Sequence, residues 1–157
     1  MKVLIIEPYS SGHHMSLYLR NIFKFFRQKK WGITIITSDK SVKSAVFKKI
    51  MKENLSNIQI ETIEHIDKPY FFVNFITIFF HQVRWWLSLR KTFKSLSKNN
   101  TFDCVYIPSI DFVIHPLALF RSPFGDTPFY GNLISSKNHL KQTSESMKYK
   151  NRLKKNI

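Results

Sequence analysis

Two short apolar segments near the N-terminus restrict the fold of this chain more than any other feature. Val3–Ile6 is a continuous run of branched apolar residues that predicts a strand buried on both faces, and Ile33–Thr37, rich in isoleucine, predicts a second strand. They begin about thirty residues apart, which is the usual size of a βαβ unit. From Met15 to Phe26, apolar and basic side chains fall on separate faces at helical spacing. The pattern therefore predicts two parallel strands joined by a helix.

The same alternation of strand and helix continues along the chain. Further strands are predicted at residues 58–63, 103–107 and 129–134, and further helices from Ser38 or Asp39 to Met51, at about 70–97 and at about 112–120. This order is typical of an α/β fold with a mostly parallel sheet and flanking helices. A length of 157 residues fits one such domain. We place it at residues 1–136 and expect residues 137–157, with seven basic residues and one acidic, to be a linker-like or disordered tail.

Charge is the unusual part of the composition. The chain has 25 Lys and Arg against 10 Asp and Glu, so its formal net charge is +15. Such an excess favours anionic partners, namely a membrane surface, a phosphorylated ligand or nucleic acid. The longest apolar run, Tyr70–Phe80, is shorter than the roughly 20 residues that a membrane-spanning helix needs. The N-terminus lacks a signal-peptide pattern, and Cys104 is the single cysteine, so we expect a cytoplasmic location and a buried core thiol.

The loop after the first strand is the strongest candidate for a binding site. Ligands of open parallel sheets bind outside the carboxyl ends of the strands, and there the chain carries Ser11, Gly12, His13 and His14. A small-residue loop before a helix presents free backbone N–H groups to a phosphate or a sugar hydroxyl. Gly12 permits close approach, and either histidine adds a donor or a base.

Other kinds of site are disfavoured. The loop lacks the GxGxxG and GxxxxGKS/T patterns, which argues against nicotinamide or ATP binding by those motifs. No Cys/His/Asp cluster accompanies the two histidines, so no metal site is expected. Asp111, just beyond the predicted fourth strand, either binds a ligand hydroxyl or caps the following helix, and the sequence favours the cap. No residue is assigned a catalytic role.

Aromatic and basic residues alternate between Phe71 and Phe93. Tryptophan and arginine suit a water–bilayer boundary, which makes this segment a candidate membrane-surface element; its candidate residues are Arg84, Trp85, Trp86, Arg90 and Lys91. The alternative is a core helix with an exposed basic face. Single-stranded nucleic acid is a weaker partner, because no RNP, KH, zinc-finger or helix-turn-helix pattern is present.

Three segments together resemble a known family. Met1–His14 resembles the opening of bacterial glycosyltransferases of the GT-B fold, family-4-like, with its strand, Gly/His loop and helix. Phe102–Pro108 with Asp111 is similar to the fourth strand of that family, and Ser122–Gly125 followed by Pro128–Gly131 is similar to its approach to the fifth. The resemblance covers about residues 1–136 and implies a Rossmann-like, acceptor-binding N-terminal domain.

The resemblance also implies that acceptor and donor bind to different domains. In such enzymes the N-terminal domain binds the acceptor, and His13 or His14 would approach the acceptor or the donor phosphates. The C-terminal domain binds the nucleotide-sugar and carries a glutamate-bearing motif, and this sequence contains no such domain. We therefore expect half of an enzyme, truncated or split, with no cofactor of its own and inactive alone.

Two functional hypotheses follow. The first is the acceptor-binding half of a glycosyltransferase that transfers a sugar from a nucleotide-sugar to a cell-surface glycan or a lipid-linked acceptor. The second is a non-catalytic basic adaptor on the anionic inner face of the membrane, or a partner subunit of a separate donor-binding, catalytic chain. Nucleic acid is the least supported partner.

Overall fold

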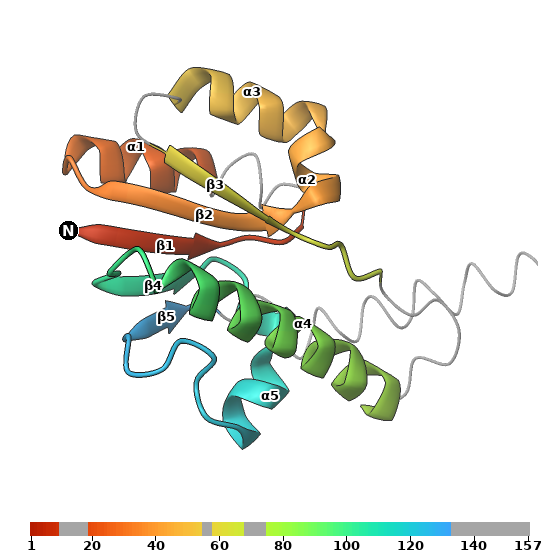
Figure 1. The fold of residues 1–157 in the computed structure, drawn as a ribbon. Coiled ribbons are helices and arrows are strands. Elements are labelled where there is room, and N and C mark those ends of the chain that lie inside the picture. Colours follow the sequence, from red (N-terminus) through yellow and green to blue (C-terminus); the bar gives the residue numbers. More distant parts are fainter. Residues whose placement is uncertain (10–18, 55–57, 68–74, 133–157) are drawn as a thin grey trace, which may run out of the picture.

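The computed structural model describes residues 1–9, 19–54, 58–67 and 75–132 (Figure 1). Within these residues five strands form one all-parallel sheet; they are β1 (Lys2–Ile6), β2 (Gly32–Ser38), β3 (Ile58–Ile63), β4 (Cys104–Ile107) and β5 (Phe129–Gly131). The helices are α1 (Arg20–Gln28), α2 (Asp39–Lys43), α3 (Ala45–Asn54), α4 (Phe75–Leu96) and α5 (Ile114–Leu119), with a 3₁₀ turn η3 (Ile110–Phe112). The expected α/β fold is confirmed.

The order of the strands is β3-β2-β1-β4-β5, with β1 at the centre. Val3 of β1 is paired with Ile33 of β2 on one side and with Cys104 of β4 on the other. From β1 the chain builds outward through β2 and β3, and then crosses back to add β4 and β5. The carboxyl ends of β1 and β4 therefore lie side by side where the direction of winding reverses, which is the usual place for a ligand in such sheets.

Helices cover both faces of the sheet (Figure 1). On one face α1 and α3 pack over alternate residues of the central strands, and this core consists of Val3, Ile5, Leu19, Phe23, Ile33, Ile35, Phe47, Ile50, Met51 and Cys104. On the other face α4 packs over Leu4, Ile6 and Ile36. Because β1 is buried on both faces, its residues Val3–Ile6 are all apolar. Cys104 is the expected core thiol, and burial raises its pKa.

The helix expected from Ser38 or Asp39 to Met51 is two helices. Ser38 caps α2, since its hydroxyl accepts a hydrogen bond from the Ser41 N–H at 3.1 Å. Ser44 then adopts an extended conformation (φ −68°, ψ 144°) and ends α2. Its hydroxyl accepts from the Phe47 N–H at 3.2 Å, which starts α3. A side-chain cap thus competes with helix continuation at Ser44.

The later elements also differ in extent from the expectation. The helix expected at about 70–97 is α4, from Phe75 to Leu96, and residues 70–74 lie outside the described residues. The helix expected at about 112–120 is divided between η3 and α5. β5 ends at Gly131, and residues 133 and 134 are outside the described part, as is the tail 137–157. Among the described helices, none is both long and apolar enough to cross a bilayer.

Candidate functional site

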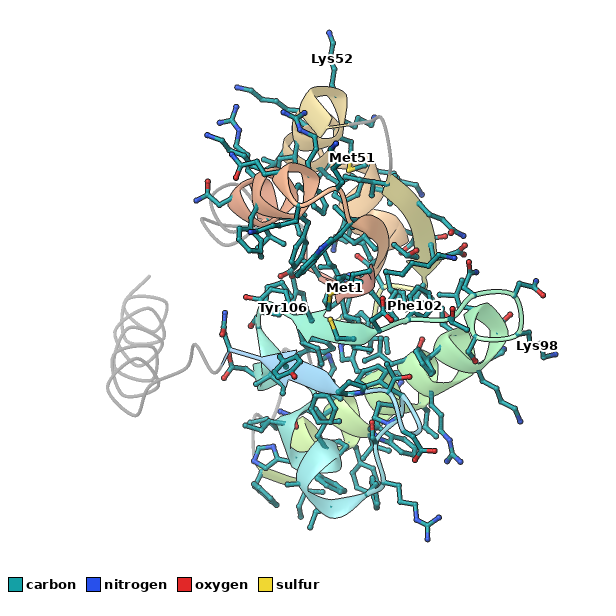
Figure 2. All side chains as sticks on the ribbon, turned by 90° about the vertical axis from the view of Figure 1, so that its left-hand side faces the viewer. Met1, Met51, Lys52, Lys98, Phe102 and Tyr106 are labelled. Atoms are coloured by element: carbon teal, nitrogen blue, oxygen red, sulfur yellow. The ribbon has the colours of Figure 1, made fainter. Side chains whose placement is uncertain are left out.

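Side chains from four elements meet at the carboxyl edge of the sheet. The ring of Tyr9, which follows β1, makes edge contacts with His65 after β3, Trp85 of α4 and Phe112 of η3, at ring-centroid distances of 6.4, 5.9 and 5.7 Å. The N-terminal half of α4 lies at this edge because α4 runs back toward the start of β4 (Figure 1). Figure 2 views the opposite edge, where the strands begin and Lys52 and Lys98 extend outward.

Glu7 is the buried acidic residue of this edge. Its side chain is only 3% exposed, and Oε1 accepts a hydrogen bond from the Tyr9 N–H at 3.2 Å. Desolvation raises the pKa of Glu7 to about 7, and this one backbone hydrogen bond only partly opposes the shift. Burial also raises the pKa of the Tyr9 phenol, with the neighbouring Glu7 charge as the second cause. The sequence alone gives Glu7 no role of its own, because its burial depends on elements that are distant in the chain.

A chain of hydrogen bonds ties the start of the first loop to β2 and β3. Ser41 Oγ donates to the Pro8 carbonyl at 2.9 Å and lies 2.8 Å from Ser38 Oγ, which lies 3.2 Å from His65 Nδ1. Since the Ser41 proton is used on Pro8, Ser38 must donate to Ser41. The Ser38 proton is then also used, so His65 Nδ1 must be the donor to Ser38. The backbone at Pro8 is thereby fixed just before the predicted binding loop.

Asp111 is at the predicted place but in a different role. It lies inside η3, whose N-cap is Ser109, and the N-cap of α5 is Val113, so the cap interpretation is wrong. Its carboxylate accepts from Ser109 Oγ at 3.3 Å. Its carbonyl accepts from Gln82 Nε2 at 2.7 Å. The alternative interpretation, a carboxylate for a ligand hydroxyl, stays a prediction.

The other predicted substrate-binding residues, Ser11, Gly12, His13 and His14, lie outside the described residues. Tyr9, the last described residue before them, lies at the same edge as Asp111, since its ring contacts Phe112. No group of three or more potential metal ligands occurs in the part of the chain that the structure describes.

The predicted membrane-surface residues separate into two groups. Trp85 and Trp86 are buried in the core below α4, so neither indole reaches the surface. Arg84, Arg90 and Lys91 are exposed, and the Arg90 guanidinium lies over the Trp86 ring at 5.2 Å. Both tryptophans share the helix face of the buried Leu89 and Phe93, which is why they turn inward. This is a core helix with an exposed basic face.

The outer face of α4 is nevertheless unusual. Ile76, Phe80 and Leu87 fall on one side of the helix and are 62%, 62% and 54% exposed. The helix carries four basic residues and no acidic one. Beside it, Leu119 at the end of α5 and the following Phe120 are also exposed. We call Ile76, Phe80, Leu87, Leu119 and Phe120 the outer apolar face.

These features define a class of fold: an α/β domain with an all-parallel five-stranded sheet flanked by helices, similar to the GT-B glycosyltransferase fold. Two solved structures of Phytolacca americana UGT2 show the likeness. The apo structure gives a TM-score of 0.59 with 14% identity and covers 92% of this chain and 33% of that one. The structure complexed with UDP-2-fluoro-glucose and pterostilbene gives a TM-score of 0.60 with 14% identity, and the match covers 92% of this chain and 34% of that one.

The likeness extends to only part of that protein. This chain spans about a third of the length of UGT2. No family model and no curated protein matches the sequence. At 14% identity the comparison establishes the fold, which is glycosyltransferase-like.

Proposed function

We propose that this chain is the acceptor-binding part of a glycosyltransferase that moves a sugar from a nucleotide-sugar to a glycan or a lipid-linked acceptor. The observation that carries the proposal is the GT-B-like fold over 92% of the chain. UGT2 shares this fold and has been seen with UDP-2-fluoro-glucose and pterostilbene. The resemblance of Met1–His14 and Phe102–Pro108 to family-4-like enzymes supports the bacterial cell-surface substrate class.

Donor binding belongs, in this proposal, to a second domain, either on the same polypeptide or on a separate chain. The chain spans only a third of UGT2, which is why we assign it one half of the reaction. Its own contribution is acceptor recognition at the carboxyl edge, through Ser11, Gly12, His13, His14 and Asp111. Glu7, whose pKa is raised to about 7 beneath that edge, can take up or release a proton near neutral pH.

The test is a binding experiment on the full 157-residue chain, observed by amide NMR. The probes are octyl β-D-glucoside below its micellar concentration, an octyl detergent whose headgroup has no hydroxyl, and UDP. We expect the glucoside alone to shift amides next to Glu7 and Asp111. His13→Ala and His14→Ala should weaken this binding, whereas Lys98→Ala, at the opposite edge (Figure 2), should not. Binding of UDP at this edge, or no response to the glucoside, contradicts the proposal.

The outer apolar face favours a second candidate, docking on an anionic membrane. Exposed apolar side chains on a helix with only basic charges match the chemistry of such a surface, with apolar insertion and attraction to lipid headgroups acting together. Arg84 and Lys91 would contact headgroups, while Phe80 would reach the acyl region.

Vesicle cosedimentation tests this candidate. The chain should bind phosphatidylglycerol vesicles, bind phosphatidylcholine vesicles less, and release as salt is raised. Phe80→Ser should weaken binding severalfold, and Phe25→Ser, which removes an exposed ring from α1 on the other side of the sheet, is the matched control. Equal binding to both lipids, or equal effects of the two variants, argues against membrane docking.

A further inference from the structure

Gln82 has an amide whose orientation is fixed by its partners. The residue is 5% exposed and lies in the first half of α4. Its Nε2 is 2.7 Å from the Asp111 carbonyl, which can only accept. Its Oε1 is 3.0 Å from the His115 N–H, which can only donate. Exchanging the amide oxygen and nitrogen would break both hydrogen bonds, so the assignment is unambiguous.

This orientation determines the protonation of His115. Its Nδ1 lies 2.8 Å from Gln82 Oε1, and an amide oxygen is an acceptor, so Nδ1 must carry the proton. In the neutral ring, Nε2 then holds a lone pair and no proton. Within the residues that the structure describes, Nε2 makes no hydrogen bond or ion pair. His115, which lies in α5 and is joined through Gln82 to the Asp111 carbonyl, is therefore a positioned hydrogen-bond acceptor.

An aromatic ring stands beside this acceptor. Phe75, the first residue of α4, makes an edge contact with the His115 ring at 5.3 Å between centroids and is itself 65% exposed. The His115 ring is partly exposed. An oriented acceptor next to an accessible apolar ring is the combination that binds a molecule with both a hydroxyl and an apolar face.

The chemistry of the acceptor restricts its ligand. A neutral imidazole with its proton committed to Gln82 offers Nε2 only as an acceptor, so a phosphate or carboxylate oxygen gains nothing there. The ligand group must bring a hydrogen. An ammonium group could do so, but the net charge of +15 repels cations. An uncharged donor is therefore the matching group, and a hydroxyl is such a donor.

We propose that His115 and Phe75 form a subsite for a sugar ring of the acceptor, with a sugar hydroxyl donating to His115 Nε2 and the apolar face of the ring packing on Phe75. This proposal rests on the glycosyltransferase function proposed above. Gln82 is a positioning residue, because it holds the imidazole in the required tautomer and does not itself face the ligand.

The tautomer is tested first, and this test does not depend on function. Long-range proton–nitrogen NMR of the imidazole at pH 8 should show a protonated Nδ1 and an unprotonated Nε2 for His115. Gln82→Leu should abolish this preference. A protonated Nε2 in the wild-type chain overturns the proposal.

Ligand binding is tested with octyl β-D-glucoside below its micellar concentration. His115→Asn retains a donor at the Nδ1 position for Gln82 but lacks Nε2, so we expect an unchanged melting temperature and roughly three- to tenfold weaker binding. Phe75→Ala should weaken binding to a similar degree. The octyl detergent without hydroxyls should show no binding at this edge, either to the wild-type chain or to the two variants.

The outcomes separate the two proposals. If the glucoside shifts amides at the carboxyl edge and binds His115→Asn as tightly as wild type, the subsite is refuted while the proposed function stands. If the glucoside shifts no amide at that edge, both proposals fail.

Discussion

Glu7→Gln should remove a specific pH dependence of stability from this chain. The Glu7 carboxyl is 3% exposed, and burial raises its pKa from 4.5 to about 7. Glutamine keeps the Oε1 that accepts from the Tyr9 N–H, and it is neutral at every pH. The substitution therefore changes the charge of one buried group with little change in shape.

The sign follows from proton binding in the two states. Between pH 4.5 and 7 the folded chain holds the Glu7 proton and the unfolded chain does not. The free energy of unfolding therefore falls as pH rises through this window and levels off above pH 7. Raising the pKa from 4.5 to about 7 lowers the free energy of unfolding by roughly 3 kcal/mol over the whole titration, and about 2–3 kcal/mol of this loss falls between pH 5 and pH 8.

Urea denaturation of both proteins at pH 5 and pH 8 measures the effect. Because other groups also titrate, the informative quantity is the difference between Glu7→Gln and wild type at each pH. We expect this difference to shift in favour of the variant by about 2–3 kcal/mol from pH 5 to pH 8. Glu64→Gln, at an exposed position, is the control and should show no such shift. A difference that is the same at both pH values refutes the argument that Glu7 is desolvated.

Two further substitutions test packing near the same edge. Gln82→Leu strips a donor and an acceptor from partly buried backbone groups and should cost roughly 2–4 kcal/mol, a fall in melting temperature of about 5–15 °C. The exposed Gln59→Leu should change stability by less than about 0.5 kcal/mol, and equal effects would contradict the burial argument. Gly131→Ala would place Cβ 2.6 Å from Ile110 Cδ1 and should destabilise by about 1–3 kcal/mol in thermal melts. Gly32→Ala, whose Cβ would lie 3.5 Å from its nearest neighbour, is the control. If Gly131→Ala destabilises the chain no more than Gly32→Ala does, β5 and Ile110 can move apart at little cost, and the steric argument fails.

The strands were predictable from the sequence because burial leaves a simple pattern in it. β1 and β2 are covered on both faces, so Val3–Ile6 is a continuous apolar run and β2 is dominated by isoleucine. The break at Ser44 was not predictable in this way, because the apolar spacing from Val42 to Met51 continues across it. A serine cap, which depends on local backbone geometry, ends one helix and starts the next.

The candidate site was predictable in position and less so in chemistry. Asp111 lies at the carboxyl end of β4, as parallel topology requires, but Ser109 and Val113 occupy the cap positions. The pairing of Gln82 with His115 joins residues 33 apart in sequence, and only the path of α4 back over the sheet brings them together. No sequence spacing predicts contact between residues this far apart, so the partner of His115 and its protonated nitrogen could not be predicted from the sequence.

The two cores of the sheet are completed at different times during synthesis. The core under α1 and α3 draws all its members except Cys104 from the first 51 residues. The opposite core forms only when α4 is present. A nascent chain that has emerged only as far as β3 therefore has one face of its sheet covered by helices, and Leu4, Ile6 and Ile36 on the other face remain exposed to solvent. Such a surface attracts chaperones and promotes aggregation. Ribosome-stalled chains whose residues up to about 66 have left the exit tunnel should therefore bind chaperones more strongly than longer chains from which α4 and β4 have also emerged. Equal binding would show that the exposed face is covered in another way.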